Sequence, residues 1–292
     1  MIDTKCLTPM MQQYMETKKQ YSDCILFYRL GDFYEMFFDD AITASKELEI
    51  TLTGKNCGLE ERAPMCGVPY HSVDSYLNRL VEKGYKVAIC EQVEDPQQAK
   101  GIVKREVVRV VTAGTNMNAQ ALDETKNNYI MCIVYIADRY GLAVADVSTG
   151  DYFVTELDSG RKLLDEIHKF SPSEIICNES FYMSGLDLDD LRHRLGMMIY
   201  SIDTHFFDDE MCARILKEHF HAASLEGMGL GDYNCGVIAA GALLKYLYET
   251  QKTSLSHITH ITGYATGRYM LLDSSSRRNL ELCETLREKQ KR

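Results

Sequence analysis

An alternation of two hydrophobic patterns along residues 1–115 restricts the fold of this chain more than any other feature. Continuous runs of strand-forming residues occur at 24–28, 32–38, 50–53, 85–90 and 107–112. Apolar residues at helical intervals of three and four occur at 8–20, 39–48 and 72–84. A chain in which helices alternate with strands folds as a sheet covered by helices. We therefore expect a mixed-sheet α/β domain over residues 1–115.

Local signals indicate where these elements begin and end. Gly31 predicts a tight bend between the first two strands, because glycine adopts backbone conformations that other residues avoid. Asp39 and Asp40 are expected to cap the helix that follows them, since carboxylates accept hydrogen bonds from the free amides of a first helical turn. Residues 54–69 are rich in glycine, proline and charge and are predicted to form a loop.

The second half of the chain has a different order of elements. A polar stretch at 116–128 lacks both hydrophobic patterns and is predicted to be a linker. Three strands joined by short turns are expected at 130–136, 142–147 and 152–155. Further helices are expected at 160–169, 186–195, 207–221 and 234–250, and further strands at 174–177 and 198–202. This order is typical of ribonuclease-H-like folds, so we expect such an α/β domain over 129–266.

The last residues, 267–292, are interpreted as the start of a third domain. Leu280, Cys283 and Leu286 lie at helical spacing, with no packing partner visible in the rest of the sequence. We expect a short helix here, belonging to a domain that continues beyond this chain.

The charge of the chain is unevenly distributed. The net charge of −11 excludes a protein that binds nucleic acid over its whole surface, because phosphate contacts come from Lys and Arg. Residues 1–115 hold 14 basic and 17 acidic residues, so most of the negative charge lies in the second half. Between positions 100 and 109, the single acid Glu106 accompanies four basic residues, Lys100, Lys104, Arg105 and Arg109. This segment forms either a positive surface or an ordinary solvated strand.

The cysteines and the hydropathy exclude other classes of protein. Ten cysteines are scattered along the chain without a C-x-x-C pair, so we expect reduced thiols and no metal site. No apolar run approaches the roughly 18 residues of a membrane span, and the first residues do not resemble a secretion signal. We therefore expect a cytoplasmic protein that does not bind membranes.

Phe33 and Glu35 are the residues with the clearest chemical potential. Alternate residues of a strand share one face of the sheet, so both side chains are expected on the same face. An aromatic plate would then stand beside a carboxylate. The alternative is that Phe33 belongs to the core and that Glu35 is its solvated neighbour, and spacing alone does not decide between them.

A set of segments resembles the MutS family of DNA mismatch repair proteins. They are FYRLGDFYEMFFDDA at 27–41, PMCGVPYH at 64–71, VAICEQ at 87–92, VRVVTAGT at 108–115, ADVSTG at 145–150 and RRNLEL at 277–282. The resemblance runs in order along essentially the whole chain. It departs from the family pattern at Cys66 and at Ala113, where proline is expected.

The resemblance implies a role for each of these residues in recognising mispaired DNA. Phe33 would be a wedge that stacks on a mispaired base from the minor groove, and Glu35 would form a hydrogen bond to that base. We add the hypothesis that Glu35 binds as the neutral acid, because it would have to donate a proton to an acceptor such as a ring nitrogen of the base. The same resemblance places four further residues near that groove, Met65, Pro69, Tyr70 and His71. Three basic residues are expected to contact phosphates without reading sequence, Lys100, Lys104 and Arg105.

The resemblance also implies what the rest of such a protein does. Residues 1–115 would be the mismatch-recognition domain, and 129–266 a connector that contacts downstream repair proteins. The family's ATP and Mg²⁺ would bind outside this chain, whose sequence lacks a Gly-x-x-x-x-Gly-Lys-Ser/Thr phosphate loop. We therefore expect no enzyme activity and no cofactor in this chain. The full-length protein is expected to bind double-stranded DNA as a homodimer.

Two other functions are compatible with the residues. A ribonuclease-H-like domain can be a nuclease whose carboxylates hold divalent metals. The candidates for such ligands are Asp146, Asp151, Glu156, Asp165 and Glu166. Alternatively, the acidic second domain is an interaction module, because its negative charge suits protein contacts better than phosphates.

Overall fold

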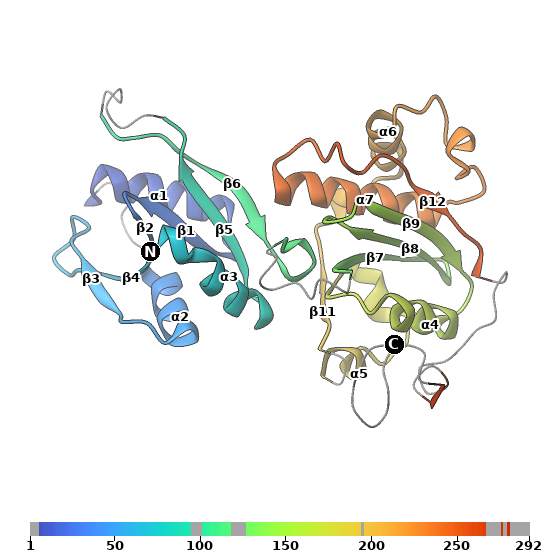
Figure 1. Cartoon of the computed structure of the whole chain (residues 1–292), viewed down its shortest axis with the longest axis horizontal. Helices are drawn as coiled ribbons and strands as arrows, with labels where there is room; N and C mark the ends of the chain where they lie inside the picture. The colour runs from blue at the N-terminus through green and yellow to red at the C-terminus, as the bar shows by residue number, and fades with distance from the viewer. Residues whose placement is uncertain are drawn as a thin grey trace. The chain divides into compact units, whose positions relative to one another are not determined.

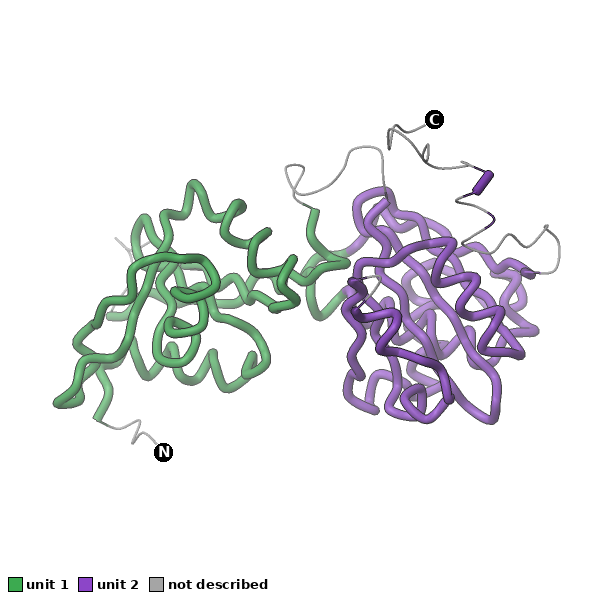
Figure 2. Tube along the Cα trace, turned by 90° about the horizontal axis from the view of Figure 1, so that it is seen from below, with its two compact units in different colours: residues 1–126, 248–254 green, residues 127–247, 255–292 purple. Residues whose placement is uncertain are grey.

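The structure is a computed structural model that describes residues 6–94, 101–117, 127–193, 196–266, 276 and 279–280. The chain divides into two compact units (Figure 2). The first unit comprises 1–126 and 248–254, and the second comprises 127–247 and 255–292. Each unit is built on a six-stranded mixed sheet, which confirms the predicted α/β class. Among the described helices, none combines the length and apolar character needed to cross a bilayer.

The sheet of the first unit has the strand order β3-β4-β2-β1-β5-β6. Its strands are β1 (Cys24–Leu30), β2 (Phe33–Phe37), β3 (Thr53–Lys55), β4 (Ala63–Pro69), β5 (Lys86–Gln92) and β6 (Arg105–Val111). Only the β1–β5 pair is parallel, and the four other neighbouring pairs are antiparallel. Strands β1 and β2 therefore lie at the centre of the sheet, joined by the predicted tight bend at Gly31.

Three α-helices cover the two faces of this sheet (Figure 1). They are α1 (Pro9–Gln20), α2 (Phe38–Leu48) and α3 (Val73–Glu82), with short 3-10 turns η2 (Tyr70–Ser72) and η3 (Ala113–Thr115). On one face, Met11 and Tyr14 of α1 pack with Phe37 of β2. On the other face, α2 and α3 pack against Tyr34 and Met36 of the same strand. The alternation of β2 thus divides its side chains between two cores.

The predicted strand at 50–53 and the predicted loop at 54–69 are both wrong. Strand β3 begins at Thr53, and β4 runs through the expected loop between β2 and β3. Pro64 and Pro69 gave this stretch the composition of a loop, but they are the second and the last residues of β4, close to the strand ends where proline is tolerated.

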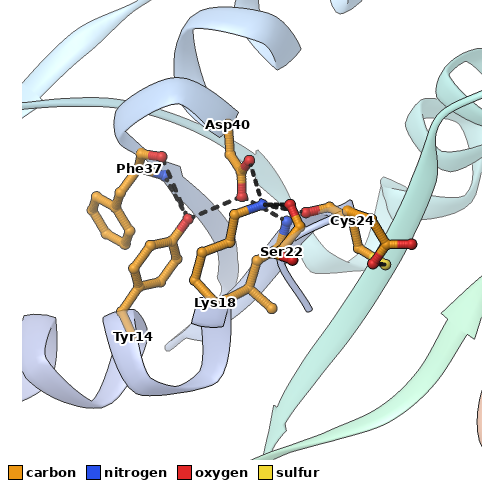
Figure 3. Close-up of polar contacts among 8 residues, drawn as sticks. Tyr14, Lys18, Ser22, Cys24, Phe37 and Asp40 are labelled. Carbon is orange, nitrogen blue, oxygen red and sulfur yellow. Dashed lines mark hydrogen bonds and ion pairs between the residues drawn. The ribbon is translucent and has the colours of Figure 1, made fainter. Parts of the chain in front are cut away.

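Asp39 and Asp40 do not cap α2 as predicted. The helix begins after Phe37, and the Asp40 carboxylate lies buried beneath its first turn. Oδ2 of Asp40 accepts hydrogen bonds from the Leu26 amide at 3.0 Å and from the Tyr14 hydroxyl at 3.2 Å (Figure 3). Its Oδ1 lies 2.9 Å from Nζ of Lys18. One buried carboxylate therefore joins α1, β1 and α2.

The sheet of the second unit has the strand order β11-β10-β7-β8-β9-β12. The strands are β7 (Tyr129–Ile136), β8 (Arg139–Asp146), β9 (Asp151–Leu157), β10 (Glu174–Cys177), β11 (Met198–Ser201) and β12 (Thr262–Gly263). Strands β7, β8 and β9 form the predicted antiparallel meander, while β10 is parallel to β7 and β11. The expected ribonuclease-H-like order of strands is confirmed.

Helices lie on both faces of the second sheet (Figure 1). They are α4 (Gly160–Phe170), α5 (Leu188–His193), α6 (Asp209–His219) and α7 (Cys235–Gln251), with 3-10 turns η4 (Glu179–Met183), η5 (Thr204–Phe207) and η6 (Glu226–Met228). Helices α4 and α5 share one core with the meander. Helix α7 packs against the opposite face, where a Cβ on Gly141 would stand 2.0 Å from the Cys235 carbonyl oxygen. Only glycine therefore allows this approach of α7 to β8.

Most of the predicted C-terminal helix lies outside the described residues, and so do 118–126 of the predicted linker. Leu280 is described and exposed. The domain boundaries at 115, 128 and 266 stay a prediction.

Candidate nucleic-acid interface

Strand β2 presents an aromatic ring and a carboxylate on one face of the first sheet. Tyr34 and Met36 are buried among α2 and α3, whereas Phe33 and Glu35 point to the opposite face, as predicted. The Phe33 side chain is 46% exposed, so it is not a core residue. Glu35 is half-buried beside it.

The register of β4 brings two more predicted residues to this surface. Phe33 lies opposite Pro69, and Phe37 lies opposite Met65. Directly opposed residues of an antiparallel pair share a face. Met65 and Pro69 therefore border the ring and the carboxylate, and we call these four residues, Phe33, Glu35, Met65 and Pro69, the probe face.

Glycine at position 67 leaves space beside the carboxylate. Gly67 lies directly opposite Glu35 in the β2–β4 pair. A Cβ there would stand 3.2 Å from the Tyr34 carbonyl oxygen and 3.5 Å from Cγ of Glu35. An added Cβ would press on the Tyr34 carbonyl oxygen and would touch Glu35 only at van der Waals distance, so the glycine leaves the space beside the carboxylate unfilled.

Lys55 is a member of the site that sequence reasoning missed. Its Nζ lies 2.5 Å from Oε2 of Glu35 and 5.6 Å from the centre of the Phe37 ring. The side chains of Lys55 and Glu35 are 33% and 17% exposed, so the ion pair is only partly solvated. The loop predicted at 54–69 concealed this residue. A strand that continued from Thr53 would have placed Lys55 on the same face as Thr53.

Tyr70 and His71 follow β4 in the turn η2 and are both exposed. The two rings meet edge to face at 5.9 Å. The Tyr70 amide donates a hydrogen bond to the Asp32 carbonyl at 2.9 Å, and the Arg29 guanidinium lies 3.9 Å from the centre of the Tyr70 ring. These contacts attach η2 to the bend before Phe33.

The structure distinguishes the three basic residues that were predicted to contact phosphates. Lys100 lies outside the described residues. Lys104 is exposed and pairs with Glu106 at 2.6 Å, and the hydrogen bond to that carboxylate raises the pKa of Lys104. Arg105 is half-buried and donates to the carbonyl oxygens of Arg29 at 2.8 Å and Val103 at 2.9 Å. Lys104 is thus available to a ligand, whereas Arg105 already binds the chain itself.

Comparison with known proteins places these features in a family. MutS domain I matches residues 8–120, and MutS domain II matches residues 128–259.

The chain belongs to the MutS family.

Curated MutS proteins match nearly the whole chain. The DNA mismatch repair protein MutS of Lachnoclostridium phytofermentans is 66% identical over 286 residues, which cover 98% of this chain and 31% of the relative. Those of Ruminiclostridium cellulolyticum and Acetivibrio thermocellus are 55% and 53% identical, and each match covers 98% of this chain and 33% of the relative. The chain therefore spans about a third of the length of the curated relatives it matches.

MutS domains I and II correspond to the mismatch-recognition and connector domains of the family. The first sheet, with the probe face, lies in MutS domain I, and the second sheet lies in MutS domain II.

Four of the five connector carboxylates that suggested a nuclease, all except Asp165, accept hydrogen bonds from neighbouring residues of the chain. Asp146 is fully buried, and its two oxygens accept hydrogen bonds from the Ser148 amide at 2.8 Å and the Asn128 amide at 3.0 Å. Glu166 accepts from Lys169 at 2.9 Å and from the Tyr264 hydroxyl at 2.6 Å. These two carboxylates fix a turn and a helix of the MutS connector.

Two other candidates have partners of their own. Glu156 accepts a hydrogen bond from the Gly236 amide at 2.8 Å, and Asp151 accepts one from the Thr149 hydroxyl at 2.9 Å. Within the described ranges, no three His, Cys, Asp or Glu side chains come together as a metal site.

Proposed function

We propose that this chain recognises mispaired or unpaired bases in duplex DNA at the start of mismatch repair. In this proposal Phe33 enters the minor groove as a wedge and Glu35 forms a hydrogen bond to the displaced base. One observation carries the proposal: an exposed phenylalanine and a half-buried carboxylate stand side by side on one sheet face of MutS domain I.

The physics of base stacking explains how such a face selects a mismatch. An apolar wedge unstacks a base step at a cost of a few kcal/mol. Stacking of a base on an aromatic ring returns about 1–3 kcal/mol. A mispaired base has already lost part of its pairing energy, so the balance favours insertion of Phe33 there. Deformability of the duplex is thereby converted into affinity.

The carboxylate adds a chemical test at the inserted position. Phosphates repel a carboxylate, and the Lys55 ammonium beside Glu35 offsets that repulsion. In the free protein the Glu35 carboxylate is paired with Lys55. We propose that Glu35 leaves this ion pair and takes up a proton from solvent when a base is inserted, and that it then reads the displaced base through a hydrogen bond, which it donates as the neutral acid to an acceptor such as a ring nitrogen. A base whose edge offers no acceptor at this position would bind less well.

The remaining predicted contacts are assigned by their position. Met65 and Pro69 border the wedge, so we propose that they contact the sugars and bases beside it. Tyr70 and His71 are proposed to lie near the same groove. Two of the basic residues predicted earlier, Lys100 and Lys104, are proposed to position the duplex through its phosphates. Arg105 is proposed to do so only through guanidinium N–H groups other than those that donate to the Arg29 and Val103 carbonyls.

We also propose the functions of the longer protein by analogy with the family. It would act in the cytoplasm as a homodimer, bind ATP and Mg²⁺ outside the residues of this chain, and contact downstream repair proteins through the connector. No step of that ATP chemistry is assigned to residues of this chain.

Binding of a G·T-mismatched duplex and of the matched duplex tests the proposal. Binding is measured for this chain alone and for a chimera, in which this chain replaces the matching third of the Lachnoclostridium phytofermentans relative. Phe33→Ala should remove most of the preference for the mismatch. The matched control is Ile42→Ala on α2, which removes an apolar side chain of similar exposure, 49%. Preference that survives Phe33→Ala unchanged would refute the wedge.

A further inference from the structure

The bend before Phe33 is held by two residues, Arg29 at the end of β1 and Tyr70 in the turn η2. Leu30 pairs with Phe33, so the bend consists of Gly31 and Asp32 alone. Gly31 has φ of +59°, a left-handed conformation that favours glycine. Phe33 is the first residue after this bend, so the direction of its ring depends on the conformation of the bend.

Both carbonyl groups of the bend accept hydrogen bonds from neighbouring residues. Nε of Arg29 donates to the Gly31 carbonyl oxygen at 2.5 Å. The Tyr70 amide donates to the Asp32 carbonyl oxygen at 2.9 Å. A two-residue bend offers only these two carbonyls, so Arg29 and Tyr70 together hold both of them.

The two residues also hold each other. The Arg29 guanidinium lies over the Tyr70 ring, with Cζ 3.9 Å from its centre, in the geometry of a cation–π contact. Nη1 of Arg29 lies 3.7 Å from Oε2 of Glu91, and the same carboxylate accepts a hydrogen bond from the Tyr34 hydroxyl. The Arg29 carbonyl in turn accepts from Arg105 at 2.8 Å. The arginine is therefore fixed at both its main chain and its side chain.

The Arg29 side chain lies on the face of the sheet opposite to the probe face. Arg29 pairs with Tyr34, whose side chain belongs to the core beneath α2 and α3. Phe33 and Glu35 alternate with Tyr34 and point the other way. The Arg29 side chain therefore holds the bend from the face that a base inserted at Phe33 does not reach.

We propose that Arg29 and Tyr70 are positioning residues for the Phe33 wedge, and this inference rests on the proposed function. They fix the bend in the free protein, so the ring is already oriented when the duplex arrives. A ring that is ordered beforehand loses less conformational entropy on insertion, which strengthens binding to the mismatch. The Arg29 substitutions should therefore act on mismatch preference through Phe33, and not on affinity for DNA in general. Loss of the Tyr70 ring, which is also proposed to lie near the groove, should lower both.

A double-mutant cycle with Phe33→Ala tests this coupling. Arg29→Met and Tyr70→Ala should each lower the ratio of mismatched to matched affinity by about threefold to tenfold. Tyr70→Phe keeps the ring and the amide and should retain the ratio. Arg29→Lys keeps the charge without the planar guanidinium and should behave like Arg29→Met. In the Phe33→Ala background none of these substitutions should change the ratio further.

Controls separate positioning from folding and from direct contact with DNA. Arg79→Met removes an exposed arginine of α3 and should leave the ratio unchanged. Thermal unfolding measures the stability of each variant. If Tyr70→Ala does not fold, the comparison of Tyr70→Phe with Arg29→Lys takes its place. A loss of matched-DNA affinity in Arg29→Met that persists with Phe33→Ala would overturn the proposal, because it would make Arg29 a phosphate contact. A ratio unchanged by Arg29→Met would overturn it as well.

The same cycle distinguishes this inference from the proposed function. If Phe33→Ala leaves the mismatch preference intact, the wedge itself fails and the positioning role fails with it. If Phe33→Ala removes the preference but the Arg29 variants keep it, only the positioning role fails.

Discussion

Lys55 Nζ lies 2.5 Å from Oε2 of Glu35, so the carboxylate of the probe face is paired with a cation before any DNA is bound. The pair spans from β3 to β2 across β4, with Glu35 opposite Gly67 and Lys55 opposite Ala63. A partly exposed pair of this kind adds only about 0–1 kcal/mol to stability. Its importance therefore lies in the charge that the probe face presents to a phosphate backbone.

Removal of the Lys55 charge should weaken binding to all duplexes. In Lys55→Met the Glu35 carboxylate loses its partner and repels the phosphates, so affinity for matched and mismatched DNA should fall by roughly threefold to tenfold. Adding Glu35→Gln should restore part of the loss, because the repelling charge is then gone. Titrations of the two single variants and the double variant measure the coupling. If the loss of binding free energy in the double variant equals the sum of the two single losses, the coupling is contradicted.

Glu35 itself can be tested for hydrogen bonding apart from charge. Glu35→Gln retains a donor at the same position, whereas Glu35→Ala retains none. If the neutral acid donates to the base, the glutamine variant should bind a G·T mismatch more tightly than the alanine variant across pH 6 to 8. Fluorescence anisotropy with a labelled duplex measures both. Equal affinities at every pH would exclude the donor role.

The buried Asp40 carboxylate should be essential for the stability of the first unit. Asp40→Ala leaves the Leu26 amide and the Tyr14 hydroxyl without their acceptor and the Lys18 ammonium without its ion-pair partner. Breaking a buried ion pair in this way costs about 3–5 kcal/mol. Urea unfolding measures the free energy of unfolding of each variant. The control is Asp39→Ala, because Asp39 is an exposed neighbour in the same helical turn. Similar losses in the two variants would show that the burial is unimportant.

Gly141 should tolerate no side chain, because α7 approaches β8 at this residue. An alanine Cβ would stand 2.0 Å from the Cys235 carbonyl oxygen, so the helix has to move. We expect Gly141→Ala to destabilise the second unit by about 3 kcal/mol. Gly227→Ala, where the nearest atom is 3.8 Å away, should cost far less. Thermal unfolding of both variants decides this, and equal melting temperatures would contradict the close contact.

Thiol chemistry should distinguish Cys6 from the buried cysteines. Burial raises the pKa of Cys66 and of Cys90 to about 12, so both remain neutral thiols at pH 8. Alkylation proceeds through the thiolate, whose fraction falls as the pKa rises above the working pH. Iodoacetamide should therefore label exposed Cys6 in the native protein, and Cys66 and Cys90 only in denaturant. Peptide mass mapping locates the labels, and native labelling at Cys66 would disagree with its burial.

The hydrophobic patterns predicted the elements well where each pattern was continuous. Strand Glu174–Cys177 was predicted to the residue and the ends of the three meander strands to within three residues, because an unbroken apolar run between turn residues has few other interpretations. The pattern failed at β4, whose prolines and glycine serve a particular register and not a loop. With β4 unrecognised, the ion pair between Lys55 and Glu35 could not be predicted.

The candidate site was predictable in part for a related reason. The period of two in a strand places Phe33 and Glu35 on one face, but it does not reveal whether that face is covered. The exposure of Phe33 depends on how much of this face α1 covers. The role of Asp40 depends on contacts among three separate elements. Such contacts join residues far apart in sequence, which no local pattern records. The assignment of Phe33 and Glu35 to a mismatch stays a prediction.

The parallel pairing of β1 with β5 has a consequence for synthesis of the protein. Strand β1 leaves the ribosome early, yet one of its two neighbours, Lys86–Gln92, follows only after β2, β3 and β4. Until then its edge carries unpaired amide and carbonyl groups that other nascent chains can bind. In the second unit β7 also waits for a parallel neighbour, β10, but fewer residues separate that pair, from Ile136 to Glu174, than separate β1 from β5, from Leu30 to Lys86. Slow translation between β4 and β5 should therefore increase aggregation more than a pause of equal length after β6, when both edges of β1 are paired.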